Sequence, residues 1–147
     1  MKVLFLAPVR RGGPHLSLKK LCNHYNSTDK LSGTFKASFF GFLEGIFSWK
    51  YDMIHTVLPV PFNIWGTPII LNIRGNYKKE KSFKNLLAYL YPISIYFSKQ
   101  IVSPSNYMMN ELKINKFKII PNSVENGVLK YKKNNFKIGE TLKLVIV

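Results

Sequence analysis

Residues 3–14 read VLFLAPVRRGGP, and this stretch decides the fold. Its first five residues are all apolar, which is typical of a strand buried on both faces in a parallel sheet. A proline ends the run, and a basic turn that contains Gly12 and Gly13 follows it. Beyond Pro14, apolar side chains recur at helical spacing as far as Tyr25. The chain therefore opens as a strand, a glycine-containing turn and an amphipathic helix.

The rest of the chain alternates in the same way between apolar runs and amphipathic stretches. Strands are expected at residues 53–57, 68–73, 101–102 and 118–120, and a polar loop at 26–33. Residues 35–49 could form a helix or a strand, and a helix is favoured. Residues 83–97 are expected to form two helical pieces or one helix with a kink at Pro92. A further helix is expected to run up to Lys113, with Ser103 as its N-cap and Pro104 as its first residue. This alternation predicts an α/β fold, with a Rossmann-like, doubly wound, mostly parallel sheet and helices on both faces.

Composition and charge narrow the class of protein. The 147 residues carry 22 Lys and Arg against 7 Asp and Glu, a net charge of +15, and 46% of them are hydrophobic. That apolar share excludes a disordered, collagenous or disulfide-stapled chain. The lone Cys22 cannot form an internal disulfide, which favours a reducing compartment, and no apolar run reaches the ~20 residues of a membrane span. The charge favours an anionic partner, and nucleic acid, lipid headgroups and a phosphorylated substrate all fit it.

The sequence changes character after residue 125. Residues 126–141 are polar and lysine-rich, like a linker, and residues 142–147, LKLVIV, have the pattern of a strand. A strand of this type needs crossover helices to cover it. We therefore expect residues 1–125 to form an N-terminal domain and residues 142–147 to be the first strand of a second domain.

Candidate binding residues follow the ends of the predicted strands, because ligands of open α/β sheets bind at the carboxyl ends of the strands. These residues are Arg11, Gly12, Gly13, His55, Arg74, Gly75, Ser103, Asn122 and Glu125. The two adjacent glycines would let the backbone approach a phosphate ahead of a helix N-terminus, or they form a tight turn and nothing more.

Arg74 and His55 each have two interpretations. Arg74 ends a buried strand, where its guanidinium could clamp a phosphate or carboxylate or pair with an acid across the sheet. His55 is either a hydrogen-bonded structural residue or a catalytic group. Other chemistries lack their motifs in this sequence: there is no G-x-G-x-x-G, P-loop lysine, G-x-S-x-G elbow or set of residues with metal-ligand spacing.

Five segments come in an ordered series. After the strand–Gly–Gly–helix opening, the chain reads YDMIH at 51–55, TPIILNIRG at 67–75, IVSPS at 101–105 and IIPNSVE at 119–125. Together these segments resemble the N-terminal half of glycosyltransferases with the GT-B fold, of the group 1 (family four) type. The resemblance covers nearly the whole chain.

The resemblance implies a retaining, metal-independent enzyme without a cofactor, which transfers a hexose-type sugar from a nucleotide-diphosphate donor to a lipid-linked or polysaccharide acceptor. Gly12 and Gly13 would face the donor diphosphate, and Arg74 and His55 would lie near the reacting centre. Arg74 stands where the family usually has histidine, and Glu125 replaces the aspartate of the family's hinge motif. The donor-binding elements would belong to a C-terminal domain beyond residue 147, so this chain alone is expected to be inactive.

A lysine-rich run suggests where such an enzyme would work. Lys78, Lys79, Lys81 and Lys84 adjoin an apolar, aromatic stretch. The resemblance implies a cytoplasmic protein, peripheral on the inner face of the cell membrane, with these lysines resting on anionic lipid. They are equally compatible with the solvated side of a helix that covers the sheet. The alternative function is a basic α/β module that binds nucleic acid or a membrane surface without catalysis, and nucleic acid is the less favoured partner because no nucleic-acid motif occurs.

Overall fold

A computed structural model describes residues 1–9, 12–28, 31–38, 40–80 and 86–120. Their strands form one parallel sheet in the order β2-β1-β3-β4-β5-β6. The strands are β1 (Lys2–Ala7), β2 (Ser32–Ala37), β3 (Met53–Thr56), β4 (Ile69–Asn72), β5 (Gln100–Ser103) and β6 (Lys118–Ile119). The helices are α1 (Gly13–Asn26), α2 (Gly41–Phe47), α3 (Tyr77–Glu80), the 3-10 helix η1 (Leu86–Leu90), α4 (Tyr91–Phe97) and α5 (Asn106–Leu112). The predicted Rossmann-like α/β fold is confirmed.

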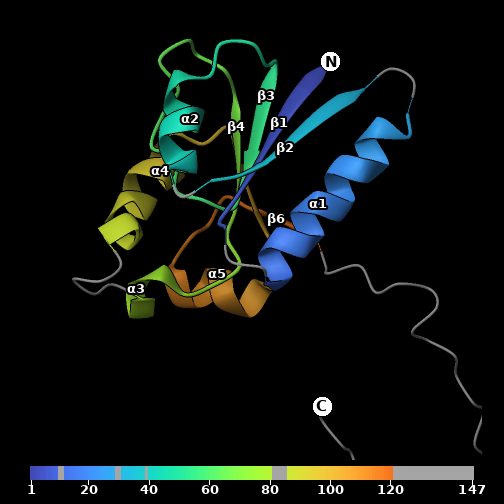
Figure 1. The fold of residues 1–147 in the computed structure, drawn as a ribbon. Coiled ribbons are helices and arrows are strands. Elements are labelled where there is room, and N and C mark those ends of the chain that lie inside the picture. Colours follow the sequence, from blue (N-terminus) through green and yellow to red (C-terminus); the bar gives the residue numbers. More distant parts are fainter. Residues whose placement is uncertain (10–11, 29–30, 39, 81–85, 121–147) are drawn as a thin grey trace, which may run out of the picture.

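Helices lie on both faces of the sheet, as Figure 1 shows. Helix α1 covers one face, and α2 and α4 cover the other. Helices α3 and α5 lie at the end of the sheet where α1 begins. Because β1 leads directly into α1 and all strands run in the same direction, this end is the carboxyl edge of the sheet.

Strand β1 lies inside the sheet and explains the apolar run that opens the sequence. Val3, Phe5 and Ala7 pack against α1, while Leu4 and Leu6 pack on the α2 side, and all five are essentially inaccessible to solvent. Burying a side chain of this size stabilises the fold by about 1.5–3 kcal/mol. A polar residue at any of these positions would lack a partner, which is why the run is continuous.

Helix α1 has the amphipathic face that the sequence predicts. Leu18 and Cys22 are buried against the sheet, and Leu21 and Tyr25 pack partly buried beside them. The helix begins after Gly12, with a proline within its first two positions. Proline is favoured there because the first helical N–H groups have no partner inside the helix.

The prediction for residues 26–49 is wrong in part. Strand β2 occupies Ser32–Ala37, where a loop and then a helix were expected, and α2 begins only at Gly41. β2 is an edge strand that pairs only with β1 in the described sheet, and most of its side chains are at least partly accessible. An edge strand of this kind needs no apolar run, so its pairing with β1 rather than its own pattern makes it a strand.

The second half of the described chain follows the predictions more closely. Strands β3 to β6 fall within two residues of the expected bounds, and the helical region before β5 is divided into η1 and α4, with Pro92 in the first turn of α4. The predicted start of α5 is wrong, because Ser103 belongs to β5 and Ser105 is the N-cap. The Ser105 hydroxyl accepts a hydrogen bond from the backbone N–H of Tyr107.

The predicted linker at 126–141 and the predicted strand at 142–147 lie outside the described residues. Among the residues that the structure describes, no helix has both the length and the apolar character needed to cross a membrane.

Candidate functional site

A cleft of about 400 Å³ lies beside α1 on the face of the sheet that this helix covers only in part. One wall is a single face of α1, formed by residues spaced three, four and seven apart, and the floor comes from the sheet. The lining residues are Ser17, Lys20, Leu21 and His24 from α1, His55 from β3, Asn72 and Arg74 from β4 and the turn after it, Val102 from β5, and Ile120 after β6.

The register of the strands explains the floor of the cleft. Phe5 pairs with His55, His55 with Ile70, and Asn72 with Val102, so these side chains share one face of the sheet. Phe5 lies beneath α1, and the helix therefore covers the sheet as far as His55. Beyond that point His55 of β3 and Asn72 of β4 line the cleft, and none of the described helices covers them.

His55 is a buried, neutral group in this cleft. Its side chain is 7% exposed, and its ring lies 5.7 Å from the ring of Phe5. Burial, and next to it the positive charge of Arg74, lower the pKa of His55 from 6.5 to about 4. At neutral pH the imidazole is therefore uncharged and offers one donor and one acceptor. Its Nε2 atom is buried and has no hydrogen-bond partner among the described residues.

Asn72 and Arg74 complete the polar floor. The Oδ1 atom of the buried Asn72 also has no hydrogen-bond partner in the described part of the chain. The Arg74 guanidinium is half-buried, and its Nη1 donates a 3.1 Å hydrogen bond to the hydroxyl of Ser17 on α1. Burial lowers the pKa of Arg74 from its ordinary value, yet a guanidinium stays charged at neutral pH. The floor of the cleft therefore holds one positive charge, that of Arg74, beside two neutral hydrogen-bonding groups, and Lys20 on the α1 wall adds a second charge.

Gly12 and Gly13 do not line the cleft; they lie at the start of α1, one turn before Ser17. Within the described residues, the N-cap Gly12 provides no side-chain hydrogen bond to this end of the helix, and the first turn contains no acid. A Cβ atom on Gly12 would meet only Pro14, at 3.9 Å, and one on Gly13 would meet nothing within 4 Å. Packing within the described residues thus does not require glycine at either position.

The other predicted binding residues lie away from the cleft or outside the described chain. Gly75 follows Arg74 but does not line the cleft, and its carbonyl accepts a hydrogen bond from the N–H of Tyr77. Ser103 is fully buried, with its hydroxyl bonded to the backbone of Ser105. Arg11, Asn122 and Glu125 lie outside the described residues.

Two of the four lysines predicted to contact a membrane can be placed. Lys78 and Lys79 belong to α3 and face α5: Lys78 Nζ donates to the carbonyl of Leu112 at 3.1 Å, and Lys79 forms a 2.7 Å ion pair with Glu111. The side chains of Lys81 and Lys84 lie outside the described residues. Both lysines that can be placed thus hold α3 against α5.

Sequence reasoning did not select Asn72 or the α1 face of the cleft. Asn72 had a signal, because it is the one polar residue inside the apolar run from Ile69 to Ile73. His24 is exposed on α1 and lines the cleft together with Lys20. The described residues contain no group of three or more His, Cys, Asp or Glu side chains that could hold a metal ion.

This arrangement suits an anionic ligand with hydroxyl groups. Arg74 and Lys20 supply positive charge in the cleft, and a neutral imidazole and an amide can bond to hydroxyls. A scan against protein-family models found no match for this chain, and neither a search of curated proteins nor a search of solved structures returned one.

Proposed function

We propose that this chain is the acceptor-side domain of a retaining glycosyltransferase that uses a nucleotide-diphosphate sugar. The observation that carries the proposal is the cleft beside α1, which is lined by the Arg74 guanidinium, the neutral ring of His55 and the amide of Asn72. The ordered series of segments that resembles the GT-B glycosyltransferases supports the same function.

Each group in the cleft has a role in such a transfer. When the bond from the sugar to the diphosphate breaks, negative charge grows on the leaving phosphate, and fixed positive charge stabilises it. Arg74 is already oriented by its bond to Ser17, so little reorganisation is needed when charge develops. His55 and Asn72 would hold sugar hydroxyls, because their buried Nε2 and Oδ1 atoms are available for hydrogen bonds.

The volume of the cleft agrees with a binding site that is shared between two domains. Ligand pockets in proteins run from about 300 to 1,000 Å³. At about 400 Å³ the cleft is at the small end of that range, which suits a sugar with its adjacent phosphate better than a whole nucleotide sugar. In the proposal, a second domain holds the nucleotide.

Ligand binding to this chain tests whether the cleft holds the anionic part of the donor. Isothermal titration would compare pyrophosphate and a set of nucleoside-diphosphate sugars against the wild type and Arg74→Gln. Hydrogen bonds to a charged group contribute about 1.5–3 kcal/mol, so we expect Arg74→Gln to weaken binding about 10- to 100-fold. Lys50→Gln is the matched control, because it removes one exposed charge from a residue outside the cleft.

Two results would contradict the proposal. Equal affinity of Arg74→Gln and the wild type would exclude the cleft as the anion site. Tight DNA or RNA binding with a steep salt dependence, weakened equally by Arg74→Gln and Lys50→Gln, would instead indicate a nucleic-acid module. The transfer reaction itself is tested with a screen of nucleotide-sugar donors on the complete gene product, where Arg74→Ala should abolish turnover.

A further inference from the structure

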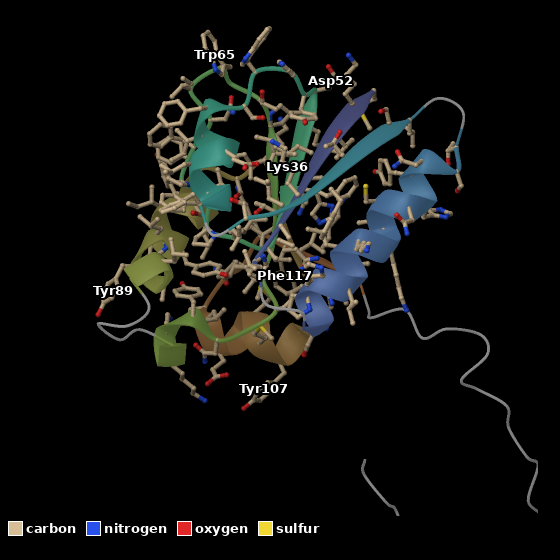
Figure 2. All side chains as sticks on the ribbon, in the orientation of Figure 1. Lys36, Asp52, Trp65, Tyr89, Tyr107 and Phe117 are labelled. Carbon is tan, nitrogen blue, oxygen red and sulfur yellow. The ribbon has the colours of Figure 1, made fainter. Side chains whose placement is uncertain are left out.

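A second pocket lies on the face of the sheet opposite the cleft, beside α2. Its volume is about 300 Å³, and its walls come from β2, from α2 and from the segment that joins α2 to β3. Figure 2 shows Asp52, which follows this segment in the chain, at the end of the molecule opposite Tyr107 of α5. Three aromatic and three charged side chains line the pocket: Phe47, Trp49 and Tyr51, and Lys36, Glu44 and Lys50. Apolar and aromatic walls with a few polar groups are typical of small-molecule sites.

The strand register explains why Lys36 lines this pocket. Lys36 pairs with Leu6, and paired residues of adjacent strands share one face of the sheet. Leu6 packs on the α2 side, so Lys36 lies on that side as well. There its Nζ forms a 3.2 Å ion pair with Glu44 of α2, and both side chains remain partly exposed.

Hydrogen bonds and packing hold the segment after α2 in place. The amide of Asn63 donates two 2.8 Å bonds, to the carbonyls of Gly45 and Ser48. At the other end, Tyr51 packs partly buried against the core on the α2 side, and its carbonyl accepts a 3.4 Å hydrogen bond from the hydroxyl of Thr67. The aromatic wall is therefore fixed at both ends before a ligand binds, which lowers the ordering cost of binding.

The charges and rings of the pocket select for one kind of ligand. Lys36 and Glu44 neutralise each other, whereas Lys50 pairs with no acid among the described residues. Its Nζ lies instead 5.4 Å from the ring centroid of Trp49, in a cation–π contact. Trp49 is 67% exposed and Phe47 is 59% exposed. The pocket thus offers one uncompensated positive charge beside aromatic surface that solvent can reach.

We propose that this pocket binds a small aromatic carboxylate, a ring that carries a single negative charge. The ring would pack against Phe47 and Trp49, because aromatic rings associate in stacked or edge-to-face pairs, and the carboxylate would accept a hydrogen bond from the Lys50 ammonium. A phosphate fits less well, because it carries up to two negative charges and the Glu44 carboxylate lines the same pocket. The pocket and the cleft lie on opposite faces of the sheet, so the proposal does not depend on the proposed function.

NMR titration with a matched set of ligands tests this selectivity. The probe is phenylacetate; phenylacetamide keeps its ring without the charge, and cyclohexylacetate keeps the charge without the aromatic ring. We expect phenylacetate to bind with a dissociation constant of about 1 mM, because so small a ligand has few atoms in contact with the protein. Phenylacetamide, cyclohexylacetate and inorganic phosphate should each bind about fivefold more weakly or not at all in this pocket.

The indole N–H signals show where the ligand binds. The chain has two tryptophans, so Trp49 and Trp65 each give one such signal, and Trp49→Phe identifies them. Phenylacetate should move the signal of Trp49. The signal of Trp65, which does not line the pocket, should stay in place.

Three variants separate the pocket from the cleft. Lys50→Gln should weaken phenylacetate binding about fivefold, which is the loss expected for a solvent-exposed ion pair, and Trp49→Ala should weaken it about tenfold. Arg74→Gln is the matched control, because it removes a positive charge from the cleft and should leave phenylacetate binding unchanged. The amide spectrum of each variant serves as the check on folding.

Four results would overturn the proposal. One is that phenylacetate at about 10 mM, tenfold above the expected dissociation constant, leaves the Trp49 signal in place. The second and third are that phenylacetamide or cyclohexylacetate binds as tightly as phenylacetate, because the charge or the aromatic ring would then play no part. The fourth is that Arg74→Gln weakens binding as much as Lys50→Gln, which would assign the ligand to the cleft.

Discussion

The buried ring of His55 makes the stability of this fold dependent on pH in a calculable way. Burial and the nearby charge of Arg74 lower its pKa from 6.5 to about 4. Between these two values the unfolded chain binds a proton that the native chain does not, so the free energy of unfolding falls as the pH is lowered through this window. Each pKa unit corresponds to about 1.4 kcal/mol, so His55 alone would cost the native state about 3 kcal/mol by about pH 4.

Urea unfolding followed by circular dichroism would measure this dependence between about pH 7 and about pH 4. His55→Gln is the informative variant, because glutamine keeps a polar group at the site but does not titrate. Its baseline stability is free to differ, since the prediction concerns the slope: the wild type should lose about 3 kcal/mol more than the variant over this range.

A direct titration of the ring by NMR separates the two causes. Arg74→Gln removes the charge and should raise the pKa of His55, while burial, the larger cause, keeps it below 6.5. The reasoning would be refuted if the wild-type and His55→Gln stability curves ran parallel, or if the ring titrated with the pKa of an exposed histidine.

Two further predictions concern packing and capping. A Cβ atom on Gly45 would lie 2.5 Å from Val60 Cγ2, so Gly45→Ala should lower the free energy of unfolding by about 1–3 kcal/mol, despite the better helix propensity of alanine. A Cβ atom on Gly41, in the same helix, would lie 2.7 Å from Leu58 Cδ1, the end of a flexible side chain, and 3.8 Å from Ser38 Cβ, so Gly41→Ala should cost less. Equal effects of the two substitutions in urea unfolding would contradict this reasoning. Ser105→Ala removes the side-chain acceptor of the Tyr107 N–H and should cost about 1 kcal/mol, whereas Ser105→Asp should retain most of it.

The sequence predicted those elements whose residues are buried on both sides. The run from Val3 to Ala7 admits few structures other than a central strand, and the helical spacing up to Tyr25 follows from the same core. Strand β2 carried no comparable signal, because it borders solvent and is specified by its hydrogen bonds to β1. The start of α5 was misplaced because two serines, Ser103 and Ser105, compete as caps, and the extent of β5 decides between them.

The sequence predicted only that the candidate site lies at the carboxyl edge of the sheet. His55 and Arg74 were selected because they stand at strand ends, and both do line the cleft. The presence of Asn72 in the cleft depends on the register of the strands, and the α1 wall depends on how far that helix extends across the sheet. The pattern of residues along the sequence shows neither of these.

The strand order has a consequence for how the chain assembles. The described strands form no hairpin, and β1 must pair with β2 about thirty residues away on one side and with β3 about fifty residues away on the other. Non-local pairings of this kind slow folding. After β3, however, each new strand is added beside the preceding one, in the order β4, β5, β6. During synthesis from the N-terminus, the sheet can therefore grow outward from β3 one strand at a time, and β3 provides an open edge until β4 has emerged.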